Sequence, residues 1–270
     1  MRAIVTLVIA VMAGSACAET RASDVEGRWQ AAVAGGFDYQ LGGAYPPPPG
    51  VTVIVRDRKA APVPGVFSIC YVNGFQTQPG EADEWLKRHP DLVLRDAAGQ
   101  PVADPNWPDE MLLDTRTEAR RQALADIVGG WIDGCADAGF DAVEFDNLDT
   151  WTRAEGLTMQ DNLALATLLI QRSHARGLWA AQKNALDLGQ GALDAGFDFV
   201  ISEECAVWGE CEGYGRLYGN RHIDIEYVDD LDSAAFLAQC GGPLPHLTVL
   251  RDRGLASSGS PDYSRTVCPT

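Results

Sequence analysis

Nine short runs rich in Val, Ile, Phe and Tyr recur at fairly regular spacing, which predicts β-strands. Helical patterns follow several of them. Between residues 118 and 138, apolar side chains recur every three or four positions and predict one helix. A second helix is predicted over residues 163–176, with Gly177 as its C-cap. The predicted strands span residues 37–43, 51–57, 66–74, 110–116, 141–147, 178–185, 197–204, 222–228 and 246–252.

Strands that alternate with helices indicate parallel βαβ units. At this length they favour an α/β fold of the closed (β/α)8 TIM-barrel type, as one domain over residues 22–270. One of the nine predicted strands would then be an extra or edge strand. The alternative is an open doubly wound sheet, which usually carries a nucleotide-binding glycine turn. Its nearest counterpart, Gly213–Gly219, follows no clear strand and is interpreted as a loop.

The N-terminus is typical of an export signal. Arg2 precedes an apolar run over residues 3–12, and Ala16-Cys17-Ala18 resembles a cleavage site. The run is too short to span a bilayer, and no other segment is long and apolar enough to do so. Residues 1–18 are therefore expected to be a cleaved signal peptide, and the protein to be secreted or periplasmic. Lipidation at Cys17 is the alternative.

Six cysteines follow the predicted cleavage site, and an oxidising compartment would favour disulfides between them. Six cysteines allow fifteen pairings. The short spacing favours Cys205 with Cys211, and Cys240 with Cys268 would secure the C-terminal tail. Cys70 and Cys135 are as compatible with free buried thiols as with a bond.

The chain has a formal charge of −17 at pH 7. An acidic protein lacks the basic face that DNA, RNA and anionic lipids require, so nucleic acid is not an expected partner. The same charge would attract a cationic ligand.

Polar residues gather at the C-terminal ends of the predicted strands, which is the catalytic face of a TIM barrel. Glu144 and Asp146 share one face of their strand, because side chains alternate with a period of two. Asp146 lies nearer the mouth and is the better candidate to touch substrate, while Glu144 lies deeper. The candidate substrate-binding residues are Asp38, Gln40, Tyr71, Asp114, Glu144, Asn147, Trp151, Lys183, Asn184 and Glu204.

Other chemistries find little support in the sequence. The four histidines are dispersed, with no H-x-H or H-E-x-x-H motif, and no G-x-S-x-G elbow or phosphate-binding loop is present. No metal or other cofactor is therefore predicted. A pair of carboxylates on different strands remains, and glycoside hydrolysis uses such a pair.

The motifs "FDYQLGG", "CYVNG", "GFDAVEFDNLD", "QKNA" and "ISEECAVWGEC" resemble those of glycoside hydrolase family 114, the endo-α-1,4-polygalactosaminidases. The resemblance covers residues 29–252 and implies a TIM-barrel enzyme that cleaves galactosamine-containing polymers internally. It also implies that Asp146 and Glu203 are the catalytic pair, with their roles unassigned. The residues alone do not separate Glu203 from Glu204. Ser202 departs from the family pattern, which usually has Asn there.

A substrate that contains unacetylated galactosamine would give the acidic charge a use, because its ammonium groups would be attracted to an acidic groove. The expected partner is thus a cationic or partly deacetylated amino-sugar polysaccharide. Trp151, Trp208 and Tyr71 are candidate platforms for sugar rings. Two alternatives stay open: a non-catalytic carbohydrate-binding barrel, and a metal-dependent hydrolase using Glu144, Asp146 and Asp149.

Overall fold

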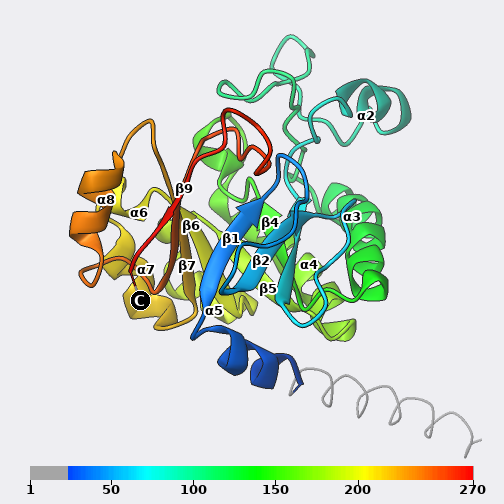
Figure 1. Ribbon diagram of the computed structural model, residues 1–270. Helices are drawn as coiled ribbons and strands as arrows, with labels where there is room; N and C mark the ends of the chain where they lie inside the picture. Colours follow the sequence, from blue (N-terminus) through cyan, green and yellow to red (C-terminus); the bar gives the residue numbers. More distant parts are fainter. Residues whose placement is uncertain (1–23, 270) are drawn as a thin grey trace, which may run out of the picture.

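The computed structural model describes residues 24–269, so the predicted signal peptide and the lipidation alternative at Cys17 lie outside the described residues. One nine-stranded sheet forms the centre of the molecule, and its strands follow one another in chain order (Figure 1). The first eight are parallel and the ninth is antiparallel to the eighth. The strands are β1 (Gly36–Gln40), β2 (Val51–Asp57), β3 (Phe67–Asn73), β4 (Ala142–Asp146), β5 (Trp179–Lys183), β6 (Phe199–Glu203), β7 (His222–Tyr227), β8 (Leu247–Arg251) and β9 (Arg265–Val267).

The sheet curls into a nearly closed barrel, which confirms the predicted TIM-barrel-type α/β fold. β1 and β8 meet across the seam, where the Arg251 guanidinium donates to the Tyr39 carbonyl at 2.5 Å. A parallel bridge joins Gly42 to Ala256 just beyond the strands. Side chains and a single bridge thus connect the two edges where a full ladder is missing.

Eight of the nine predicted strands are present, and the prediction of a strand over residues 110–116 is wrong. Residues 110–116 form only isolated bridges within the long β3–α3 connection, for example Gln76 with Leu112. The extra strand is instead β9, whose three residues carry too little pattern to be recognised.

Helices flank the barrel, and both predicted helices are present. Thr117 caps the first, and Gly139 ends it in the left-handed conformation that glycine adopts without strain. The interpretation of Gly213–Gly219 as a loop is wrong, because most of it belongs to α7. The helices are residues 24–32, then α2 (Ala82–Arg88), α3 (Glu118–Ala138), α4 (Met159–Ala175), α5 (Gln190–Ala195), α6 (Cys205–Trp208), α7 (Cys211–Tyr218) and α8 (Ser233–Gln239), with 3-10 turns η1 (Thr150–Thr152) and η2 (Leu186–Leu188).

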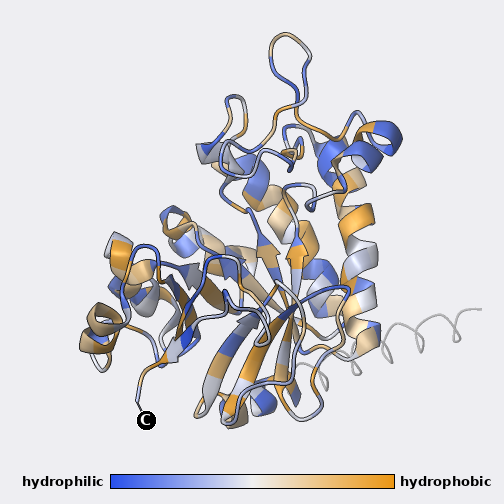
Figure 2. Ribbon diagram, turned by 45° about the horizontal axis from the view of Figure 1, so that its top comes forward, coloured by the Kyte–Doolittle hydropathy of each residue, from blue (hydrophilic) through white to orange (hydrophobic). Residues whose placement is uncertain are grey.

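Two apolar layers form the core. One fills the barrel with alternate strand residues, and the other lies between the strands and the helices. Hydrophobic residues accordingly concentrate in the strands, and most surrounding loops are hydrophilic (Figure 2). Trp29, from the N-terminal helix, is fully buried against Phe67, Trp179 and Phe199 at the beginnings of three strands. This aromatic cluster closes the bottom of the barrel and leaves the opposite end for chemistry.

Three disulfides are present: Cys70–Cys135, Cys205–Cys211 and Cys240–Cys268. The last two confirm the favoured pairs, and the first settles the question left open for Cys70 and Cys135. It ties β3 to α3 across 65 residues. Within residues 24–269, the helices are all too short or too polar to cross a membrane.

Candidate active site

Three neighbouring strands each end in an ionisable side chain that points into the mouth of the barrel. They are Asp146 on β4, Lys183 on β5 and Glu203 on β6. Each lies two positions beyond an interior residue of its strand, so alternation directs all three inward. Parallel strands in register bring these ends together, although the residues are far apart in sequence.

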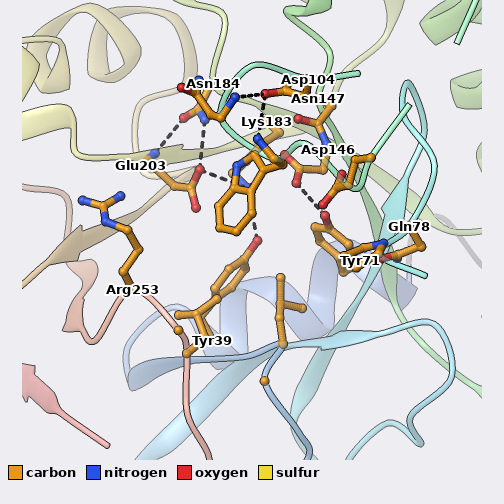
Figure 3. A pocket seen from close by; sticks show the side chains of 18 of the residues that line it. Tyr39, Tyr71, Gln78, Asp104, Asp146, Asn147, Lys183, Asn184, Glu203 and Arg253 are labelled. Carbon is orange, nitrogen blue, oxygen red and sulfur yellow. Dashed lines mark hydrogen bonds and ion pairs between the residues drawn. The ribbon is translucent and has the colours of Figure 1, made fainter. Parts of the chain in front are cut away.

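Lys183 is the hub of this arrangement. Its Nζ lies 3.2 Å from Oδ1 of Asp146 and 3.4 Å from Oε2 of Glu203 (Figure 3). Below them, the same Nζ lies 3.2 Å from Oε1 of Glu144. The lysine side chain is 2% exposed, whereas Asp146 and Glu203 are 19% and 27% exposed. The two outer carboxylates therefore reach the opening, while the ammonium stays beneath them.

A tyrosine hydroxyl donates to each of the three carboxylates. Tyr39 donates to Glu144 at 2.8 Å, Tyr71 donates to Asp146 at 2.6 Å, and Tyr227 donates to Glu203 at 2.5 Å. Burial raises the pKa of all three phenols well above the usual value, so they remain donors. These hydrogen bonds fix the three carboxylates, and those from Tyr39 and Tyr71 favour the ionised forms of Glu144 and Asp146.

The pKa values of the two acids on β4 are shifted in opposite directions. Burial alone would raise the pKa of Asp146, but Lys183, the Tyr71 hydroxyl and the Asn147 amide together bring it below the ordinary value. Glu144 is deeper, and burial raises its pKa to about 7 despite the neighbouring Lys183. Asp146 is thus held as an anion at the opening, the state that a nucleophile or base needs.

The residue after each of these strands adopts a left-handed backbone without being glycine. The φ angles are 62° at Asn147, 47° at Asn184 and 61° at Glu204. Strained backbone of this kind tends to gather at functional sites, where surrounding contacts hold it in place. Here Asn184 accepts from the Glu203 backbone amide at 2.7 Å and donates to its Oε2 at 3.2 Å. The strained turn therefore supports the carboxylate beside it.

An open cavity of about 450 Å³ lies over these side chains, and its charges are unevenly balanced. Three cations face seven carboxylates: Arg153, Lys183 and Arg253 against Asp57, Asp104, Glu110, Asp146, Asp149, Glu203 and Glu204. Arg153 pairs with Asp104 and Asp149. No arginine or lysine pairs with Glu110 within the described residues; its partner is the Asn73 amide at 2.9 Å. The cavity therefore carries a surplus of negative charge.

Comparisons with known proteins agree with this geometry. The family model for glycoside-hydrolase family GH114 matches residues 18–270. The chain belongs to glycoside-hydrolase family GH114. Its fold is similar to Aspergillus fumigatus Ega3, solved in complex with galactosamine, at 22% identity and a TM-score of 0.70 over 89% of this chain and 97% of that one. The glycoside hydrolase domain of Pseudomonas aeruginosa PelA matches at 16% identity and a TM-score of 0.55, over 83% and 96%. No curated protein sequence matches.

In this GH114 barrel, most predicted site residues lie together. The structure brings seven of them to the cavity wall: Tyr71, Asp146, Asn147, Lys183, Asn184, Glu203 and Glu204. Glu144 lies beneath them and is fully buried, as its deeper position predicts, so it contacts Lys183 rather than the cavity. Glu204 pairs with Arg253 at 2.8 Å, whereas Glu203 remains directed at Lys183.

Asp38 and Gln40 do not line the cavity, which contradicts their predicted role. Both are buried on the outer face of β1, where Asp38 pairs with Arg251 and Gln40 accepts from Arg56. The same alternation that separates Glu144 from its neighbours on β4 places Tyr39 inside and its two neighbours outside. They stabilise the barrel seam.

Asp114 and Trp151 are also outside the site. Asp114 is buried between Arg116 and Arg120, since residues 110–116 are not a barrel strand. Trp151 packs on the apolar layers around the barrel.

Trp208 is 69% exposed on α6 but does not line the cavity. The unusual Ser202 faces away from the cavity, where its hydroxyl contacts Asp224 and His222.

Several cavity residues escaped the sequence analysis. Tyr39 and Tyr227 could have been found by applying strand alternation to β1 and β7. The β3–α3 connection, at the top of Figure 1, also forms one wall of the cavity and contributes Glu110 and Trp107, which is 53% exposed. No pattern in that irregular segment marks these two residues as part of the site.

The hypothesis of a metal-dependent hydrolase requires Glu144, Asp146 and Asp149 to surround one metal ion. The space between Glu144 and Asp146 holds the Lys183 ammonium, and Asp149 pairs with Arg153 instead. Among the described residues, each side-chain group with the spacing of a metal site includes Cys205, whose sulfur is bonded to Cys211.

Proposed function

We propose that this protein is an exported, endo-acting glycosidase of galactosamine-containing polysaccharide, with Asp146 as nucleophile and Glu203 as general acid/base. The observation that carries the proposal is the Lys183 ammonium, which lies within 3.4 Å of a carboxylate oxygen on each side. Two partly exposed carboxylates at such a bridge have the spacing and the accessibility that a glycosidase pair needs.

The position of Lys183 between Asp146 and Glu203 also limits the distance between the two carboxylates, which is related to the anomeric configuration of the product. Two oxygens that each lie within 3.4 Å of one nitrogen are no farther apart than twice that distance. Retaining glycosidases separate their carboxyl groups by about 5–5.5 Å, and inverting ones by about 6.5–9.5 Å to admit a water molecule. This upper limit admits the retaining separation, and we propose that the reaction proceeds with retention through a covalent glycosyl–enzyme intermediate.

The charge of Asp146 and the exposure of Glu203 favour one assignment of roles. Asp146 is kept ionised by Lys183 and Tyr71, so it can attack the anomeric carbon. Glu203 is the more exposed acid and would donate its proton to the oxygen of the leaving sugar. In the second step it would take a proton from the water that releases the intermediate.

The substrate class is supported by charge and by similarity. The cavity holds more carboxylates than cations, so it would attract the ammonium groups of unacetylated galactosamine. The similar fold of Ega3 was solved with galactosamine bound. The cavity is open and the exposed Trp107 is part of its lining, so we propose that it admits a stretch of a long chain and that cleavage is internal.

Export is supported by the cysteines. All six cysteines among the described residues are in disulfides, which persist in oxidising compartments and are rare in the cytosol. The signal-peptide pattern at residues 1–18 agrees with this location.

A reducing-end assay on amino-sugar polymers, with and without acetylation, tests the function. Wild type should release new ends from a deacetylated galactosamine polymer, and Asp146→Asn and Glu203→Gln should each abolish release while the melting temperature stays nearly unchanged. Asp194→Asn, an exposed site on α5, is the matched control and should keep full activity. Polymer binding without any new ends would instead indicate a non-catalytic binding protein.

A further inference from the structure

Behind the catalytic face, β7 carries two buried acids on its outer side. Asp224 and Glu226 are two positions apart, so both project outward, whereas Ile225 and Tyr227 point into the barrel. Both acids are 0% exposed. They lie under the chain segment that leaves β6 directly after Glu203. No step of the proposed chemistry uses them.

Each of these acids holds one backbone amide of that segment. Asp224 Oδ1 accepts from the Cys205 amide at 3.3 Å, and Glu226 Oε1 accepts from the Ala206 amide at 2.7 Å. The Ser202 hydroxyl also donates to Asp224, at 2.5 Å. Because the turn passes through the strained left-handed residue after Glu203, these bonds hold a conformation that would otherwise relax.

The same strand holds the carboxylate itself from the inner side. Tyr227 donates to Glu203 Oε1 at 2.5 Å, and the Arg253 guanidinium lies 4.4 Å from the tyrosine ring centre. Arg253 also pairs with Glu204. β7 therefore fixes the backbone next to Glu203 from outside the barrel and its side chain from inside.

The remaining oxygens of the two acids pose a problem of charge. Asp224 Oδ2 and Glu226 Oε2 are buried, and neither accepts a hydrogen bond from any group among the described residues. Two adjacent buried anions without a cation would be strongly destabilising. One proton between them resolves this, because a protonated carboxyl donates to the other. Burial and the charge of Glu226 hold the pKa of Asp224 well above its usual range, and burial raises the pKa of Glu226 as well.

We propose that Asp224 and Glu226 share one proton and together act as positioning residues that hold the turn after Glu203 in its active geometry. This inference rests on the proposed function for the role of Glu203. When the shared proton is lost at higher pH, the pair carries two charges, the acids repel each other, and the turn loosens. Activity should therefore fall on the alkaline side.

The neighbouring groups do not supply a compensating charge. Burial lowers the pKa of His222 to about 4, so its ring is neutral, and it contacts the Ser202 hydroxyl at 2.8 Å. Tyr214 of α7 packs on that ring, and the cysteine at the start of α6 is in a disulfide. Glu204 adds a further negative charge, which Arg253 balances.

Two substitutions at one position separate positioning from packing. Glu226→Ala removes the acceptor of the Ala206 amide and should lower kcat at least about tenfold with KM within about twofold. Glu226→Gln can accept from that amide and donate to Asp224, so it should restore most of kcat and move the alkaline limb, which then reports only the general acid Glu203. The proposal is overturned if Glu226→Gln is as impaired as Glu226→Ala, or if its alkaline limb coincides with that of the wild type. The second criterion holds even if Glu226→Ala does not fold.

The shared proton can be measured without any assay of activity. Infrared spectra at neutral pH should show that Glu226→Gln and Asp224→Asn each lose one protonated carboxyl band of the wild type. An unchanged band in both variants would overturn the proposal, whatever the role of Glu203. Conversely, full activity in Glu203→Gln would refute the proposed function while the band could still report the shared proton.

Discussion

The Lys183 ammonium lies 3.2 Å from Oδ1 of Asp146, almost completely shielded from solvent. This contact explains how a partly buried aspartate at the mouth of a barrel can be ionised, because the nearby cation outweighs the cost of removing the charge from water. The same ammonium lies 3.4 Å from Oε2 of Glu203. One side chain thus sets the charge of Asp146 and contacts both members of the proposed catalytic pair.

Removing that cation should be costly for both folding and activity. Lys183→Met leaves three carboxylates close together in a buried site, and the free energy of unfolding should fall by about 3–5 kcal/mol. Lys59→Met is the control, since Lys59 is 63% exposed and pairs with Glu81 at the surface; its loss should cost about 1 kcal/mol or less. Urea unfolding of both variants measures the difference. Equal stabilities would show that Lys183 does not carry the stated electrostatic role.

The acid limb of the pH profile should report Asp146. Its depressed pKa keeps the nucleophile ionised as pH falls, and the Tyr71 hydroxyl contributes to that depression. Tyr71→Phe should therefore raise this pKa and move the acid limb of kcat/KM upward by about one pH unit. Tyr45→Phe removes a comparable hydrogen bond, to the buried Asp38, and should leave the limb in place. An unchanged acid limb of kcat/KM in Tyr71→Phe would argue against Asp146 as the titrating group.

Glu110 should favour the cationic substrate. It lines the cavity, and burial raises its pKa to about 7, so a bound ammonium would stabilise its ionised form. Glu110→Gln should raise KM for a deacetylated polymer by roughly threefold to tenfold and change KM little for an acetylated one. Glu84→Gln, on the exposed α2, should change neither value. An equal rise in KM for both polymers would show that the charge of Glu110 does not favour the cationic substrate.

The disulfides should differ in their contribution to stability. Cys70–Cys135 closes a 65-residue separation and Cys205–Cys211 one of six, so chain entropy predicts about 4 kcal/mol for the first and about 2 kcal/mol for the second. Chemical denaturation of the two double Cys→Ser variants tests this order. A larger loss from the short loop would indicate that native contacts, rather than loop length, dominate.

Sequence patterns identified the elements that repeat and missed the irregular ones. The barrel, α3 and the polar strand ends follow from periodicities that many residues share. Residues 110–116 have the composition of a strand but lie in an irregular connection, because tertiary contacts decide whether a short apolar run pairs in the sheet. The Gly213–Gly219 run looks like a loop, yet α7 packs Tyr214 and Tyr218 against the barrel.

Site residues on strands could be predicted from the alternation of side chains along each strand. Site residues contributed by distant irregular segments could not. Asp146 and Lys183 follow from their places at strand ends. Tyr39 was not predicted, because its neighbours Asp38 and Gln40 are more polar and were the stronger candidates by residue type. The strand turns both of them outward. Glu110 comes from a long connection whose course depends on packing rather than on a local pattern, so only the fold brings it to the cavity.

In the proposed reaction, Asp146 forms the covalent intermediate and Glu203 assists its release. Glu203→Gln incubated with a galactosaminide that carries an activated leaving group should form the intermediate but hydrolyse it slowly. Mass spectrometry should then show a gain of one galactosaminyl unit, on the peptide that contains Asp146. Release of sugar of inverted configuration without any adduct, or an adduct on another residue, would show that Asp146 is not the nucleophile.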